Sequence, residues 1–266
     1  WNCVDTIEYQ AAFRRVMVHR RRRVARAGWT GRRGAYTRFG AHQPQQSDRS
    51  YVKAGEREQL VGLCRERGVA IIADEVFYDY ALEPFPGNAR LAGEAGALTF
   101  ALDGFSKMLA APHAKVGWIQ VSGPETDDRE ACVAGCHRRR LPADERHHRL
   151  PHPGPVGAAK VQTDLVRGRV QGNLRALHRM LESDPLGVVS VLRAEGGWNV
   201  LLRVPGVIDE NELVLHMIDA HGVSGQPGYF FDMASNGYLA ISLLPEPDEF
   251  AHNVRVVLDS VAELLG

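Results

Sequence analysis

Residues 69–75 read VAIIADE, five apolar residues followed directly by two acids. An unbroken apolar run of this length predicts a β-strand that is buried on both faces of a parallel sheet. The acids then stand at the carboxyl end of the strand, where open α/β sheets gather their ligands. A helical pattern over residues 56–67 precedes the strand, and Gly68 supplies the positive φ that commonly ends a helix.

Two further strands are expected downstream. One covers residues 97–102 and leads into DGFSK (103–107), and the other covers residues 116–121, after Pro112. Strands that alternate with helices and end in polar residues predict an α/β fold with a doubly wound sheet.

After about residue 160 the pattern changes to that of a small α+β domain. Residues 161–181 form one long helical pattern, with an apolar face made of Val166, Val170, Leu174 and Leu177. Strands are expected over residues 198–204, 223–231 and 238–244, and helices over residues 209–221 and 248–265. We therefore expect an incomplete large domain over residues 1–160, a connecting helix over residues 161–182 and a small domain over residues 183–266.

Composition excludes several classes of protein. With 44% hydrophobic and 24% charged residues the chain can bury a core, and its apolar runs are shorter than the roughly 18 residues that span a bilayer. Four cysteines are too few for a disulfide framework in 266 residues, which favours the cytoplasm. The chain opens at Trp1 without an initiator Met or a secretion signal, so we expect a fragment.

Charge is unevenly distributed. Residues 11–49 contain eleven arginines, no lysine and one acid, which gives a formal charge of +10. A nonspecific nucleic-acid surface is one interpretation of this stretch. The arginines lack an aromatic platform and a recognisable binding fold, so we expect no nucleic-acid partner. Cys132, Cys136 and His137 have no second ligand pair at zinc-finger spacing, and we expect no metal.

Asp74 and Lys107 carry the most informative chemistry when they are taken together. Each follows a predicted strand, so both face the same edge of the sheet. This is the combination that pyridoxal phosphate needs, because an amine forms a Schiff base with the aldehyde and a carboxylate keeps the pyridine nitrogen protonated. Lys115, eight residues after Lys107, is placed to meet the phosphate.

At these residues the sequence resembles a known family. ADEVF (73–77) and GFSK (104–107), followed by Pro112, Lys115 and GW (117–118), are similar in order and spacing to the class I/II aminotransferases, fold-type I pyridoxal phosphate-dependent enzymes. PGYF (227–230) and YLAIS (238–242) resemble the C-terminal domain of the family. The resemblance covers residues 50–130 and 160–266.

The resemblance implies a role for each matched residue. Lys107 is then the Schiff-base lysine and proton shuttle, Asp74 the partner of the pyridine nitrogen, and Lys115 a phosphate ligand at a position where arginine is common.

The sequence departs from the family pattern at three positions. Phe77 replaces a tyrosine that binds the ring oxygen of the cofactor, and Tyr78 is expected to point elsewhere. Gly104 replaces a phosphate-binding hydroxyl residue. Ala240 replaces the arginine that clamps the substrate carboxylate, and Arg203 is a speculative substitute, with a solvated strand end as the alternative explanation.

The implied function is amino transfer from an amino acid to a 2-oxo acid, with pyridoxal 5'-phosphate as cofactor and a homodimer as the usual assembly. A β-eliminating lyase of the same fold is one alternative. A non-catalytic remnant of an aminotransferase gene is another, because the family's N-terminal phosphate cup and ring-stacking residue have no counterpart here.

The arginine-rich segments suggest a change of reading frame. Residues 43–49 (QPQQSDR) can be encoded by a string that, read one nucleotide later, gives Asn-Pro-Asn-Asn-Pro-Thr, the family's cofactor loop. The same shift permits an apolar strand over residues 38–42 and family-like text over residues 137–145. We predict that residues 11–49 and 131–157 are frame-shifted translation, and resequencing the locus tests this.

Overall fold

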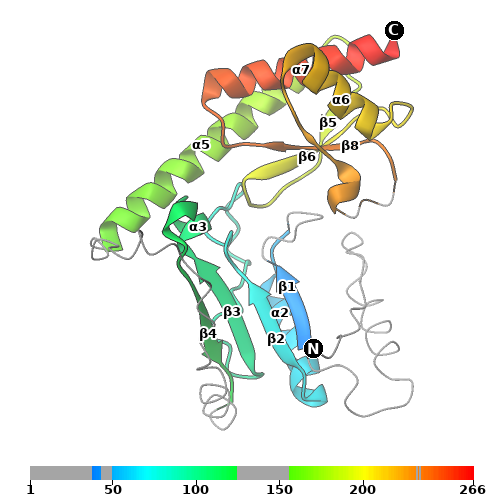
Figure 1. Cartoon of the computed structure of the whole chain (residues 1–266). Coiled ribbons are helices and arrows are strands. Elements are labelled where there is room, and N and C mark those ends of the chain that lie inside the picture. The colour runs from blue at the N-terminus through cyan, green and yellow to red at the C-terminus, as the bar shows by residue number, and fades with distance from the viewer. Residues whose placement is uncertain (1–37, 43–49, 125–155, 232, 234) are drawn as a thin grey trace. The chain divides into compact units, whose positions relative to one another are not determined.

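The structure is a computed structural model that describes residues 38–42, 50–124, 156–231, 233 and 235–266 (Figure 1). Most of the two stretches predicted to be frame-shifted, namely residues 11–37, 43–49 and 131–155, therefore lie outside the described residues. So do Cys132, Cys136 and His137. The change of reading frame stays a prediction.

The first sheet contains four strands in the order β1-β2-β3-β4. They are β1 (Arg38–His42), β2 (Ala70–Asp74), β3 (Thr99–Gly104) and β4 (Gly117–Ser122). β1, β2 and β3 are parallel, and the sequence predicts this arrangement for β2 and β3. β4 runs antiparallel to β3, so the sheet is mixed. The connection between them, residues 105–116, contains only the short helix α3 (Phe105–Met108) and the 3₁₀ helix η1 (Pro112–Ala114), not the long crossover helix that usually joins two parallel strands.

Helix α2 (Ala54–Arg67) packs on one face of this sheet. The Lys53 backbone N–H donates to the Glu56 carboxylate at 2.9 Å at the start of the helix, and Gly68 ends it with a φ of 62°. Val61 and Cys64 are buried against the β2 side chains that face the helix. Burial raises the pKa of the Cys64 thiol to about 11.

Strand β2 differs from the prediction in its burial. Ile71 and Ala73 are fully buried, whereas Ile72 and Asp74 on the opposite face are half-buried among the described residues. The prediction of burial on both faces is therefore wrong for the part of the chain that the structure describes. The apolar run indicated the strand correctly, but run length does not report what covers each face.

Strand β1 corrects a prediction from composition. Residues 11–49 contain few large apolar residues and show no period of 2 or 3.6, a composition typical of disorder, yet Arg38–His42 pair in parallel with Ala70–Asp74. The ladder joins backbone N–H and C=O groups, which every residue other than proline carries. Pairing with an apolar neighbour can therefore form a strand that composition does not indicate.

The second sheet is antiparallel, in the order β5-β6-β8-β7. Its strands are β5 (Ser190–Val191), β6 (Asn199–Arg203), β7 (Gln226–Pro227) and β8 (Tyr238–Ser242). Helices α5 (Val156–Ser183), α6 (Glu210–His221) and α7 (Pro247–Leu265) accompany it. Val170 and Leu177, on the predicted apolar face of α5, are fully buried in the core that these elements share. Both sheets belong to one compact unit of the chain.

Helix α6 begins and ends as the sequence predicts. The Asp209 carboxylate accepts the Asn211 and Glu212 backbone N–H groups, and Gly222 closes the helix with a φ of 67°.

The strand predicted over residues 223–231 is wrong beyond its two central residues. Only Gln226–Pro227 pair with β8, and η3, a 3₁₀ helix, follows over Gly228–Phe231. The Tyr229 backbone N–H turns instead to the buried Glu210 carboxylate at 3.3 Å.

Within the described residues, no helix has the length and apolar character needed to cross a lipid bilayer.

Candidate functional site

Asp74 is the last residue of β2 and lies between two parallel neighbours. Its register partners are His42 in β1 and Leu102 in β3. The Asp74 carboxylate is half-buried and accepts the Val76 backbone N–H at 3.3 Å, which fixes the turn after the strand. The structure therefore places this carboxylate at the carboxyl edge of the sheet, as the sequence predicts.

Lys107 lies just beyond the carboxyl end of the neighbouring strand. β3 leads directly into the short helix α3 (Phe105–Met108), which Figure 1 shows at the end of that strand. The Lys107 Nζ atom lies 5.4 Å from the ring centroid of Phe77 and 5.3 Å from that of Trp198. Both distances fall within the range of a cation–π contact. Phe77 is only three residues after Asp74, so the amine faces the turn that the acid begins.

Two hydroxyl groups hold the backbone of α3. The Tyr80 hydroxyl donates to the Lys107 and Met108 carbonyl oxygens at 2.7 and 3.0 Å, and the Thr163 hydroxyl donates to the Met108 carbonyl at 2.7 Å. Tyr80 is completely buried, and this burial raises its pKa to about 12. The sequence carries no signal for either residue, because neither belongs to a motif and their partners are 27 and 55 residues away.

An arginine-centred cluster lies beside Asp74. Arg90 approaches three carboxylates: Asp79 at 2.8 Å, Glu75 at 3.7 Å and Asp103 at 3.9 Å. Its guanidinium also lies 4.2 Å from the Tyr78 ring centroid. Burial raises the pKa values of Glu75 and Asp103, and the Arg90 charge partly offsets this.

Phe77 and Tyr78 are neighbours in the sequence but contact different side chains. Tyr78 contacts Arg90 and, edge to face at 5.4 Å, Tyr51, whereas Phe77 contacts Lys107. Tyr78 therefore points away from Lys107, as predicted, although it does so within a turn rather than along a strand.

The substitution at Gly104 has a packing reason. Gly104 pairs with Gly117 across β3 and β4, and a Cβ atom at position 104 would stand 2.9 Å from the Val116 carbonyl oxygen. Because that atom belongs to the backbone, the close approach of the two strands excludes the hydroxyl residue that the family pattern has here.

Lys115 follows η1, a 3₁₀ helix over Pro112–Ala114, and has a positive φ of 51°. Its side chain is exposed, on the connection between α3 and β4. A role as phosphate ligand stays a prediction.

The structure does not bring Arg203 to Lys107. Arg203 is the exposed last residue of β6, and its guanidinium lies 5.7 Å from the Tyr238 ring. Trp198, which does contact Lys107, precedes the opposite end of the strand. Four residues of strand correspond to about 13 Å. The placement fits the alternative explanation, a solvated strand end. Ala240 is buried in β8, between Leu201 and Gln226.

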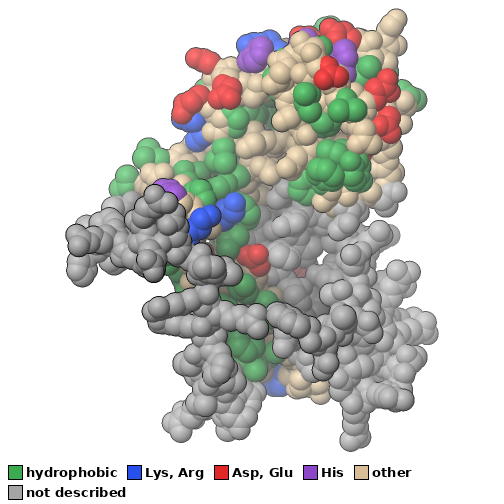
Figure 2. Space-filling model, in the orientation of Figure 1, with side chains coloured by type: hydrophobic (Ala, Val, Ile, Leu, Met, Phe, Trp, Pro, Cys, Tyr) green, Lys and Arg blue, Asp and Glu red, His purple; other side chains and the backbone are tan. Residues whose placement is uncertain are grey.

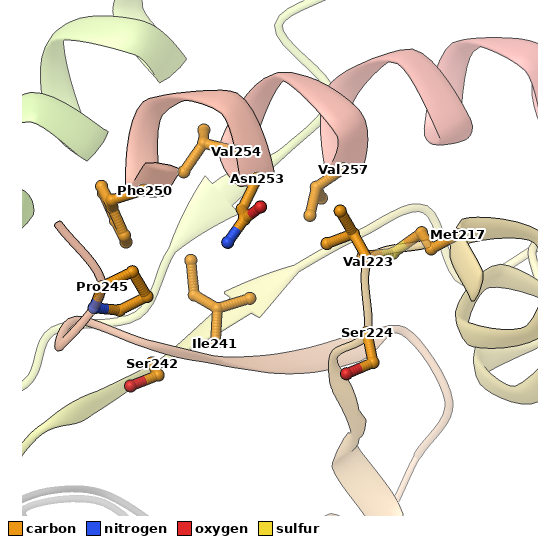
Figure 3. A pocket seen from close by; sticks show the side chains of 10 residues that line it. All are labelled: Met217, Val223, Ser224, Ile241, Ser242, Pro245, Phe250, Asn253, Val254 and Val257. Atoms are coloured by element: carbon orange, nitrogen blue, oxygen red, sulfur yellow. The ribbon is translucent and has the colours of Figure 1, made fainter. Parts of the chain in front are cut away.

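A cavity elsewhere in the chain is too small to be the site. It has a volume of about 110 Å³ and lies between β8 and α7, lined mostly by aliphatic side chains such as Ile241, Val254 and Val257 (Figure 3). Ligand pockets usually measure about 300–1,000 Å³. None of the predicted site residues lines this cavity.

Comparison with solved structures gives aminotransferases. The structure resembles the aromatic aminotransferase of Pyrococcus horikoshii, with a TM-score of 0.66, 15% identity and coverage of 86% of this chain and 61% of that one. It also resembles LysN, the α-aminoadipate aminotransferase of Thermus thermophilus, in complex with N-(5'-phosphopyridoxyl)-L-leucine. The TM-score is 0.67 at 21% identity, and the match covers 93% of this chain and 63% of LysN. For a probable N-succinyldiaminopimelate aminotransferase of T. thermophilus, the TM-score is 0.60 at 22% identity, and the match covers 84% of this chain and 58% of that protein.

The chain has the aminotransferase fold. This bears out the fold-type I class expected from the motifs around Asp74 and Lys107. No protein-family model and no curated protein matches the sequence. The chain spans less than two thirds of the length of these three aminotransferases.

Proposed function

We propose that the chain is a pyridoxal phosphate-dependent aminotransferase by ancestry, with Lys107 as its cofactor lysine. The observation that carries this proposal is the placement of the Lys107 amine. It stands at the end of a parallel strand in the aminotransferase fold, against two aromatic rings, beside the strand that ends in Asp74. We propose an amino acid and a 2-oxo acid as its substrates and a second copy of the chain as its protein partner. We propose the cytoplasm as its location.

The donor set at this edge of the sheet fits the cofactor. When bound, pyridoxal phosphate supplies an aldehyde that captures amines and a ring that takes up electron density. Lys107 supplies the amine that bonds to the aldehyde carbon. With a substrate bound, the Lys107 amine would hold and move the proton of the substrate's α-carbon, first as a base and then as an acid.

The other side chains of the site bind the cofactor and take no part in the proton transfer. Asp74 supplies the carboxylate that keeps a pyridine nitrogen protonated, and Lys115 supplies a positive charge for the phosphate. Lys115 offers a point charge without the two-pronged hydrogen bonding of an arginine. The apolar Phe77 ring packs against the amine and offers no hydroxyl to the ring oxygen.

Covalent trapping tests the assignment of Lys107. The purified chain is incubated with pyridoxal phosphate and reduced with borohydride, and the modified lysines are identified by mass spectrometry. The chain has four lysines, and Lys160 on α5 exposes 78% of its side chain, so it reports nonspecific modification. We expect the adduct at Lys107, its loss in Lys107→Ala and its retention in Lys160→Ala. Equal modification of Lys107 and Lys160, or an unchanged yield in Lys107→Ala, contradicts the proposal.

A turnover assay separates the reaction classes. Aminotransfer consumes an amino acid only when a 2-oxo acid accepts its amino group. Release of pyruvate and ammonia from a cysteine conjugate without an acceptor indicates the lyase. Trapping at Lys107 without either turnover indicates the remnant.

A further inference from the structure

Two histidines and a glutamate converge on the surface formed by α6 and α7. The Nε2 atoms of His216 and His221 lie 2.7 and 3.8 Å from the same oxygen, Oε2 of Glu263. The ligand atoms of the three side chains all lie within 4.8 Å of one another. Figure 2 shows histidine and acidic side chains close together over this part of the surface.

The packing of the two helices fixes the backbones that carry these side chains. Leu213 and Met217 of α6 and Val257 and Val261 of α7 are buried in the shared core. His216 and His221 expose 30% and 28% of their side chains, and Glu263 exposes 52%. The three side chains therefore stand on a rigid base at the edge of solvent, where an ion can enter.

We propose that His216, His221 and Glu263 form a binding site for a divalent transition-metal ion, with Zn²⁺ as the test ion. Two imidazoles and a carboxylate are a donor set that zinc uses in proteins, with water in the fourth position. Ligand atoms about 2.0–2.1 Å from a tetrahedral ion are roughly 3.3 Å apart. The separations in the structure bracket that value, so rotation of exposed side chains is enough to close the site. The ion takes the place of the direct contact between His216 and Glu263.

The spacing of the three residues along the sequence does not indicate this site. The histidines are five residues apart, whereas the usual chelating spacing on a helix is four. His221 is the last residue of α6, and Glu263 comes from another helix. The site shares no residue with the proposed cofactor site, so it stands or falls independently of the aminotransferase proposal.

Zinc titration of the full chain tests the site. Binding is followed with a chromophoric chelator as competitor, without pyridoxal phosphate, because that cofactor also binds metals. We expect the unmodified chain to bind Zn²⁺. Three variants should each bind one equivalent at least about 10-fold more weakly: His216→Gln, His221→Gln and Glu263→Gln. Losing even a residue that only hydrogen-bonds to a ligand lowers metal affinity about 10–100-fold. His252→Gln, which changes an exposed histidine elsewhere on α7, is the matched control and should bind as the unmodified chain does.

Cobalt provides a second readout that does not depend on the variants folding. Co²⁺ bound to the unmodified chain should give visible absorption bands of tetrahedral or five-coordinate intensity, which added Zn²⁺ abolishes. Absence of Zn²⁺ binding by the unmodified chain overturns the proposal. So does unchanged affinity in the three variants, or an equal loss in His252→Gln.

Discussion

Arg90→Gln is the substitution that best tests the charge balance beside Asp74. Arg90 forms ion pairs with Glu75, whose side chain is only 1% exposed, and with Asp103, which is 11% exposed. Both carboxylates have raised pKa values, caused first by burial and reduced by the charge of Arg90. Removing that charge leaves two buried carboxylates less compensated, and the variant should be less stable.

The expected loss depends on pH. Opposite unit charges 4 Å apart attract by about 4 kcal/mol at an effective dielectric constant of 20. Arg90 is 34% exposed, so we take about half of this, near 2 kcal/mol, and add about 1 kcal/mol for the contact with the Tyr78 ring. Because the pKa values of Glu75 and Asp103 are raised above their ordinary values of 4.5 and 3.8, both carboxylates take up protons as the pH falls toward those values. Protonation removes the negative charges, and with them the destabilisation caused by the loss of Arg90. The loss should therefore be about 3 kcal/mol at pH 8 and smaller at pH 5.

Urea denaturation followed by circular dichroism measures this loss. Arg193→Gln is the matched control, because the Arg193–Glu83 ion pair is short, at 2.7 Å, but more than half exposed on both sides, so its loss should change the stability little. Adding Glu75→Gln to Arg90→Gln should recover about 1 kcal/mol at pH 8, since it removes one uncompensated charge. An equal loss at both pH values, or no recovery in the double variant, refutes the electrostatic explanation.

Two further predictions concern the contacts between residues 50–53 and 195–196. Gly196→Ala should destabilise the chain by about 1–3 kcal/mol in urea denaturation, because its Cβ atom would stand within 2.6 Å of the buried Tyr51 ring; a change below 0.5 kcal/mol contradicts this. Partial burial acts to raise the pKa of Glu195. The opposing effects are together larger: the Lys53 amine and the Tyr51 backbone N–H donate to the Glu195 carboxylate at 2.5 and 2.9 Å and hold its pKa below the ordinary value. Glu195→Gln should therefore cost about 1–3 kcal/mol above pH 4.5, and the difference should disappear as the pH falls further; a pH-independent difference between the two proteins rejects the assignment.

Much of the fold could be predicted because it depends on local patterns. Gly68 and Gly222 end their helices where predicted, and Asp209 begins α6, because these signals act within one turn of helix. The apolar run before Asp74 indicated a strand for a similar reason. The order of Asp74 and Lys107 along the chain placed them at neighbouring strand ends because β2 and β3 are parallel.

The errors arise where long-range pairing decides. Strand direction in β4 and the strand over Arg38–His42 depend on backbone partners in other segments, which side-chain patterns do not record. Residues 228–231 turn away from β8 because a buried carboxylate, Glu210, binds the Tyr229 N–H. Arg203, the speculative substrate ligand, lies at the opposite end of β6 from Trp198, and its role stays a prediction.

The position of Lys107 shows why the site needs both halves of the chain. A helix of four residues is not stable by itself, since forming the first turn costs more than one hydrogen bond returns. α3 is therefore held by its surroundings: Tyr80 comes from the turn after β2, whereas Thr163 comes from α5 and Trp198 from the start of β6. Each of these contacts is directed at the Lys107 main chain or amine, or at the adjacent Met108 carbonyl. The lysine is consequently oriented only when the second sheet and its helices have folded against the first, and the orientation of the proposed cofactor lysine is a product of the whole described fold rather than of the GFSK motif.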